Sequence, residues 1–238
     1  MLPGSIACCS LSPPHPVMVS RPPTPQRLLI AGPAGPLEAL VAVPEGFGGA
    51  RAAVVCQPHP LHGGSMDNKV VHTVARTLEE MGLATVRFNF RGVGASGGIH
   101  DDGRGETDDA SAICDWARIE WRPAELWLAG FSFGALVAAR LATRERATPR
   151  AVARLATIAP PVQRLDAGER LDPGCPWLIV QGNADDLVNV DAVRTWIAQS
   201  GVSPHLVVLS GVDHFFHGRL HELKATLQAE LPGLRQEP

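Results

Sequence analysis

The stretch Gly130-Phe131-Ser132-Phe133-Gly134 decides the fold prediction for this chain. The apolar run 125–129 before it has the length of a β-strand, and the Ala- and Leu-rich run 135–142 after it is typical of an α-helix. A serine on a sharp strand-to-helix turn is a nucleophile elbow, in which a strained backbone lifts the hydroxyl above the sheet. Glycine two residues to either side lets strand and helix approach where a Cβ would collide. We therefore expect Ser132 to be a nucleophile.

The same five-residue pattern occurs a second time, at Gly94-Ala95-Ser96-Gly97-Gly98. This copy lies several residues beyond the strand-like run 85–90, and the run 99–103 that follows has the composition of a loop. A nucleophile elbow needs a helix directly behind its serine. The context therefore favours Ser132 over Ser96, with an unreactive elbow at Ser132 as the other alternative.

The composition is that of an ordinary globular protein, with 45% apolar and 19% charged residues among 238. A net charge of -3 gives no electrostatic reason to expect nucleic acid or an anionic membrane as a partner. No apolar run has membrane-spanning length. The five cysteines are odd in number and scattered, unlike a secreted disulfide framework, so we expect a cytoplasmic protein.

Two regions are expected. Residues 1–25 are rich in proline and lack periodicity, which predicts a disordered N-terminal extension. Residues 26–238 alternate strands with helices, which predicts one α/β domain with a mostly parallel twisted sheet of about eight strands and helices on both faces. The predicted strands span 26–31, 37–43, 51–56, 84–90, 125–129, 151–158, 177–180 and 205–209, and the predicted helices span 70–81, 106–117, 135–142, 190–198 and 219–231.

Two local features of this plan bear on the site. Ser65 or Asp67 is expected to cap the first helix, and Gly82 to end it. The connection 159–176 is too short for an inserted helical lid, so we expect an open site whose substrate is selected by loops.

Candidate catalytic residues follow three of the predicted strands. In open α/β sheets the ligand lies beyond the carboxyl ends of the strands, and Ser132, Asp185 and His214 all fall there. His214 is expected to take the Ser132 proton, and Asp185 to fix the tautomer of the imidazole. Their order along the chain, Ser, Asp, His, is the one expected of a hydrolase with this elbow.

Each of these assignments has an alternative. Asp186 can replace Asp185 as the acid, or can cap a helix instead. His214 can simply anchor a turn at a strand end. Asp213 adjoins the histidine, but neighbouring side chains diverge, so we do not expect it to be the partner.

An oxyanion hole needs two backbone N–H donors. The first is expected from Phe133, at the positive N-terminus of the helix behind Ser132. The second must come from the loop after the strand 51–56, where the prolines at 58 and 60 have no N–H to give. His59 and Leu61 remain, and we favour His59.

Neither a metal ion nor a cofactor is expected. His214, His217 and His221 can share a helical face, and His59 and His62 lie in one loop, but no zinc-binding sequence motif occurs. Arg91 and Asn89 can bind an anionic substrate, although an arginine among glycines usually fixes its own loop. Four aromatic residues near the site are candidates either for an acyl pocket or for the core: Phe131, Phe133, Phe215 and Phe216.

Together these motifs resemble the α/β-hydrolase superfamily over nearly all of 26–231. The runs 58–71 (PHPLHGGSMDNKVV), 89–94 (NFRGVG) and 211–218 (GVDHFFHG) are similar to those of small, lidless bacterial serine hydrolases. That group is similar to the dienelactone hydrolases, although here the elbow carries serine and not cysteine. Gln57 stands where the group is expected to have histidine, a departure that concerns the oxyanion loop.

The resemblance implies a serine hydrolase of the carboxylesterase or thioesterase type, acting on a small-molecule ester or thioester through an acyl-enzyme. Two alternatives stay open from the sequence. One is a non-catalytic member of the fold that binds a ligand or partner, and the other is an acyltransferase.

Overall fold

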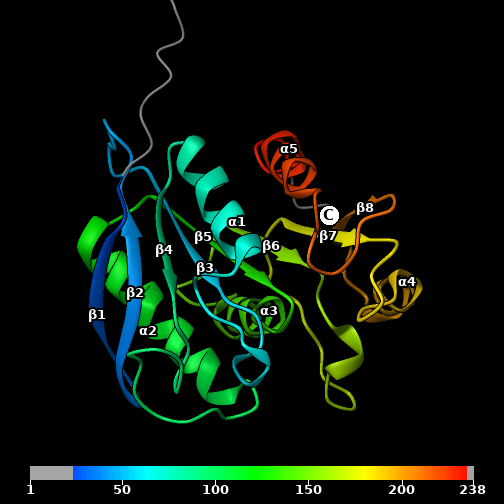
Figure 1. The fold of residues 1–238 in the computed structure, drawn as a ribbon, viewed down its shortest axis with the longest axis horizontal. Coiled ribbons are helices and arrows are strands. Elements are labelled where there is room, and N and C mark those ends of the chain that lie inside the picture. The colour runs from blue at the N-terminus through cyan, green and yellow to red at the C-terminus, as the bar shows by residue number, and fades with distance from the viewer. Residues whose placement is uncertain (1–23, 235–238) are drawn as a thin grey trace, which may run out of the picture.

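An eight-stranded twisted sheet runs through the computed structural model, which describes residues 24–234 (Figure 1). In chain order the strands are β1 Gln26–Gly32, β2 Gly35–Ala42, β3 Arg51–Cys56, β4 Ala84–Phe88, β5 Glu125–Phe131, β6 Arg154–Ile158, β7 Trp177–Gly182 and β8 His205–Leu209. Their order across the sheet is β1-β2-β4-β3-β5-β6-β7-β8. Only β2 runs against its neighbours, so the predicted fold class is confirmed. The extension predicted to be disordered lies outside the described residues, apart from residues 24 and 25.

Helices cover both faces of the sheet. Within residues 24–234 they are α1 Lys69–Glu80, α2 Arg104–Trp121, α3 Phe133–Glu145, α4 Val190–Ser200 and α5 Leu220–Glu230. Helices α1 and α5 pack side by side on one face, whereas α2, α3 and α4 lie on the other (Figure 1). None of these helices combines the length and apolar character needed to cross a membrane.

Alternating strand residues build two separate cores. In β3, Val54 packs into the core under α2 and α3, while its neighbour Val55 packs into the core under α1 and α5. In β5, Leu128 and Ala129 divide in the same way. Central parallel strands buried on both faces read as continuous apolar runs, which is why the sequence identifies them so clearly.

The start of α1 differs from the prediction. The N-cap is Asn68, whose Oδ1 accepts hydrogen bonds from the N–H groups of Val70 and Val71. Neither Ser65 nor Asp67 caps the helix: Ser65 Oγ accepts from the N–H of Asp67, and the Asp67 carboxylate lies 3.3 Å from Arg87 Nη1. The prediction of the helix end is confirmed, with Gly82 at φ +85° immediately beyond Met81.

The connection between β6 and β7 begins at the carboxyl edge of the sheet and holds no inserted helical domain. The segment 159–176, between β6 and β7, contains one turn of 3-10 helix, η2 Val162–Arg164, and no helical insertion. The site at this edge therefore has no lid, as expected from the length of the segment.

The elbow depends on two contacts that only glycine permits. Ser132 lies between β5 and α3 with φ 53° and ψ -121°. A Cβ on Gly130 would lie 2.1 Å from the carbonyl oxygen of Gly134, and a Cβ on Gly134 would lie 2.2 Å from that of Gln57. Because backbone atoms cannot yield as a side chain can, the turn holds α3 against both β5 and the end of β3.

We expect Gly134→Ala to lower the free energy of unfolding by about 2 kcal/mol or more, since the methyl group would overlap two backbone carbonyls at the end of β3. Gly48→Ala is the matched control, because no heavy atom lies within 4 Å of its added Cβ and its φ is not positive. Urea denaturation of both variants measures the difference. Equal effects of the two substitutions would contradict the packing assigned to the elbow.

Candidate active site

Three side chains from three strand ends meet at the carboxyl edge of the sheet. Ser132 follows β5, Asp185 follows β7 and His214 follows β8. His214 Nε2 lies 3.0 Å from Ser132 Oγ, and His214 Nδ1 lies 2.8 Å from Asp185 Oδ2. The structure therefore brings together the three residues selected from the sequence.

The surroundings of Asp185 fix its carboxylate. Oδ1 accepts hydrogen bonds from the N–H groups of Leu187, at 2.9 Å, and Val188, at 2.7 Å, and Oδ2 also accepts from Gln181 Nε2 at 3.0 Å. Burial alone would raise the pKa of Asp185, but the hydrogen bonds from His214 and from Val188 outweigh it and lower the pKa. The neighbouring Asp186 is exposed.

The Asp185 carboxylate determines which ring nitrogen of His214 carries the proton. An ionised carboxylate can only accept, so Nδ1 carries a proton toward Asp185 and Nε2 is left to accept from the Ser132 hydroxyl. The imidazole is buried, with ring centroids of Phe131 and Phe215 each 5.1 Å from its own. Asp213 turns to His217 instead, accepting from its N–H and lying 2.7 Å from its Nδ1.

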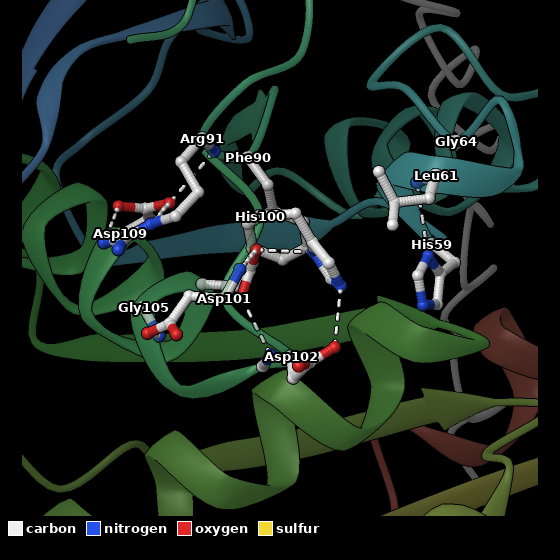
Figure 2. Close-up of polar contacts among 12 residues, drawn as sticks. His59, Leu61, Gly64, Phe90, Arg91, His100, Asp101, Asp102, Gly105 and Asp109 are labelled. Atoms are coloured by element: carbon white, nitrogen blue, oxygen red, sulfur yellow. Dashed lines mark hydrogen bonds and ion pairs between the residues drawn. The ribbon is translucent and has the colours of Figure 1, made fainter. Parts of the chain in front are cut away.

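The loop after β3 presents one of the two expected N–H donors. Figure 2 shows the His59 ring at the start of the short 3-10 helix η1 Pro60–His62, where Nδ1 accepts from the N–H of Leu61 at 3.2 Å. The Leu61 N–H is thus occupied by the His59 side chain. Within residues 24–234 the N–H groups of His59 and Phe133 have no hydrogen-bond acceptor. Of the two candidates in this loop, His59 is the one with a free donor.

Gln57 holds this loop in place. Its Nε2 donates to the carbonyl of Gly64 at 3.0 Å, and its Oε1 accepts from the N–H of Phe90 at 3.4 Å. The side chain is completely buried and ties both ends of the oxyanion loop to the strand end at β4. The departure from the expected histidine therefore leaves the loop with an amide that fixes its shape.

The imidazole of His100 lies beside this loop, and the sequence alone does not single it out. The His100 ring lies toward His59 (Figure 2), with 4.8 Å between the ring centroids. It also packs against Phe133, whose ring centroid is 5.6 Å away. Its Nδ1 lies 2.8 Å from Oε1 of Glu106, a side chain that is completely buried. The available signal was a histidine six residues before a glutamate at a helix start, which by itself is too common to be informative.

Other candidates from the sequence have structural partners. Ser96 Oγ donates to the carbonyl of Asn89 at 2.7 Å and accepts from the N–H of Glu38 at 2.9 Å. The Arg91 guanidinium binds Asp109 through Nε and Nη2, which ties its loop to α2 (Figure 2). Within residues 24–234, no three or more His, Cys, Asp or Glu side chains gather as a set of metal ligands.

His59 provides a test that depends on pH. Burial lowers its pKa to about 4, and the neighbouring His100 and His62 add to the effect. An unfolded histidine titrates near pH 6.5, so between about pH 6.5 and 4 the unfolded chain binds a proton here that the folded chain does not. His59 therefore makes the folded protein less stable as the pH falls through this window.

We expect His59→Asn to reduce the loss of stability between pH 7 and 4.5, because asparagine can still accept from the Leu61 N–H but does not titrate. Urea denaturation at several pH values measures the effect. Between pH 7 and 8, outside the window, parent and variant should change in parallel. Parallel curves across the lower window as well would contradict the environment assigned to His59.

Comparison with known proteins agrees with the fold described above. A family model described as the alpha/beta hydrolase fold matches residues 60–172. An alpha-beta serine hydrolase homologue from Coxiella burnetii is 44% identical, with a TM-score of 0.77 and coverage of 85% of this chain and 95% of that chain. A dienelactone hydrolase from Anabaena variabilis has a TM-score of 0.71 over 91% of this chain and 100% of its own, but at 17% identity it shows the fold alone.

A further similar structure bears on the missing lid. It is a serine hydrolase without lid from Xanthomonas campestris, 40% identical, with a TM-score of 0.81 over 95% of this chain and 100% of that chain. Both the Coxiella and the Xanthomonas relatives exceed 30% identity over nearly their whole lengths. Since the connection 159–176 also lacks an inserted helix, the chain belongs to the α/β serine hydrolases that have no lid.

Proposed function

We propose that this hydrolase cleaves carboxylic esters or thioesters through an acyl-enzyme on Ser132. The observation that carries the proposal is the hydrogen-bonded series from Ser132 Oγ through His214 to Asp185, with distances of 3.0 and 2.8 Å. An unassisted serine hydroxyl is a poor nucleophile at neutral pH, and this arrangement supplies a base oriented by a third group.

In the first half of the reaction, Ser132 Oγ attacks the acyl carbon while His214 Nε2 takes its proton. The negative charge that develops on the carbonyl oxygen is stabilised by the N–H groups of Phe133 and His59. Asp185 remains ionised and stabilises the imidazolium. The tetrahedral intermediate then collapses, and His214 gives its proton to the departing alkoxide or thiolate.

In the second half, His214 takes a proton from a water molecule that attacks the acyl-enzyme, and then returns that proton to Ser132 Oγ. The carboxylic acid leaves and the free enzyme is restored. Every proton passes through a side chain of this site, so the mechanism as written involves no metal ion or cofactor.

The nucleophile is tested by two serine variants of the same motif. We expect Ser132→Ala to lose both hydrolysis of p-nitrophenyl acetate and labelling by a fluorophosphonate probe, because the Ser132 hydroxyl faces the His214 imidazole. Ser96→Ala should retain both, with a loss of about 1 kcal/mol in the free energy of unfolding, since its hydroxyl bonds only to the backbone.

Labelling of the Ser132→Ala protein at an unchanged rate would contradict the assignment. A folded parent protein that neither labels nor turns over esters would instead favour a non-catalytic member of the fold.

The assignment of Asp185 as the acid of the site is tested by comparing it with the neighbouring Asp186. We expect Asp185→Asn to lower kcat by about 10³- to 10⁴-fold, because an amide there would no longer hold the Nδ1–H tautomer and would not stabilise the imidazolium. Asp186→Asn should change kcat by less than about twofold, since its side chain is exposed. Steady-state kinetics with the same ester measures both, and a larger effect at Asp186 would reverse the assignment.

A further inference from the structure

A pocket of about 310 Å³ is lined by Phe215, the residue that follows the proposed catalytic histidine, and by seven further residues. One wall is the start of α1, and the other is the segment that follows His214 and leads into α5. The lining residues are Asn68, Lys69, Val70, Phe215, Phe216, His217, Gly218 and Leu220. This volume is at the lower end of the range for small-molecule sites, enough for one ring-sized group.

The position of the pocket connects it to the site. Helix α1 follows the loop that carries His59, and Phe215 follows His214 directly, so both walls belong to the carboxyl edge of the sheet. The Phe215 ring centroid is 5.1 Å from that of His214 and 6.3 Å from that of Phe131. Phe215 is nevertheless 46% exposed, so part of its ring is open to a ligand in the pocket that it lines.

The walls combine apolar surface with hydrogen-bond donors. Val70, Phe215 and Leu220 supply apolar surface. Asn68 uses its Oδ1 to cap α1, so its Nδ2 amide stays available as a donor. None of the eight lining residues is acidic. A ligand group that fits these walls is apolar along its length and carries an acceptor or a negative charge at its end.

Lys69 supplies the charge. The chain has two lysines, and Lys224 is paired with Glu80 at 2.7 Å. The Lys69 ammonium makes no ion pair with any residue in 24–234, and its side chain is exposed at the pocket. Nearby carboxylates are engaged elsewhere, with Asp67 on Arg87 and Asp213 on His217. An unneutralised cation at the edge of an apolar pocket favours an anionic ligand group.

We propose that this pocket binds the leaving-group half of the substrate, and that it selects an apolar alcohol or thiol that ends in a carboxylate. The inference rests on the proposed function. His214 Nε2 must pass its proton from Ser132 Oγ to the leaving atom, so that atom has to lie on the imidazole side, away from the N–H groups of His59 and Phe133. Phe215 lines the pocket and its ring packs against the imidazole of His214, so the pocket lies on that side of the site.

The charge preference is tested with 4-acetoxybenzoate and its neutral amide, 4-acetoxybenzamide. The two esters share the acetyl-enzyme, so the ratio of their kcat/KM values reports only the leaving group. We expect this ratio, carboxylate over amide, to fall about three- to fivefold in Lys69→Met relative to the parent, and to lose its salt dependence. Lys224→Met, which removes the paired lysine, should leave the ratio as it is in the parent. An equal ratio in the parent and Lys69→Met would overturn the proposal.

The location of the subsite is tested by Leu220→Trp, which fills the pocket. We expect the preference for aryl acetates over ethyl acetate to fall at least threefold, while the preference among p-nitrophenyl esters of different acyl chains stays unchanged. The reverse pattern would make the pocket an acyl site and overturn the proposal.

If the parent hydrolyses neither these two esters nor p-nitrophenyl acetate, the proposed function is wrong, and calorimetry then decides the pocket by itself. Tighter binding of 4-hydroxybenzoate than of 4-hydroxybenzamide in the parent, but not in Lys69→Met, would still support the pocket, and equal binding would overturn it.

Discussion

The site depends on one steric constraint, the contact of the backbone behind Ser132 with the end of β3. Gly134 lies against the carbonyls of Cys56 and Gln57, and Gly130 lies against Gly134. Because no Cβ separates these segments, the N-terminus of α3 and the loop that carries His59 converge on one point. The N–H of Ser132 is also held by the carbonyl of β6 at Ile158, 2.8 Å away. A strained serine conformation persists here because its neighbours on three strands leave it no alternative.

The convergence of the other two side chains follows from the order of the strands. β5, β6, β7 and β8 are consecutive across the sheet, so the segment after β8 must reach back over the end of β7 to bring His214 to Ser132. A Cβ on Gly182 would lie 2.1 Å from the carbonyl oxygen of Val212, so this crossing too needs a glycine. Asp185 lies in the loop that follows β7, next to the segment that brings His214 back. Its carboxylate therefore reaches Nδ1, the imidazole nitrogen that does not face Ser132.

The order and burial of the strands determine how much of the site the sequence could predict. Buried parallel strands are apolar and end in polar loops, so local patterns were enough to place Ser132, Asp185 and His214 at one edge and to favour Ser132 over Ser96. Choices among close neighbours were harder. Three residues within four positions can cap α1; Asn68 is the one that does, while the Asp67 carboxylate lies against Arg87. The contact of His100 with the oxyanion loop joins distant segments through side chains alone, and no periodicity encodes it.

An enzyme without a lid cannot exclude water by closing, so its electrostatic groups must be fixed in advance. Here these groups sit on segments held by buried polar side chains: Gln57 fixes the loop that carries the His59 N–H donor, and Gln181 donates to the Asp185 carboxylate and helps to fix it. His214 and the residue that follows it face different parts of the site. The imidazole faces inward to Ser132 and Asp185, while Phe215 is partly exposed at the pocket. If the pocket holds the leaving group as proposed, changes in Lys69 and Leu220 alter which leaving group is accepted, while the hydrogen bonds of His214 come from Ser132 and Asp185.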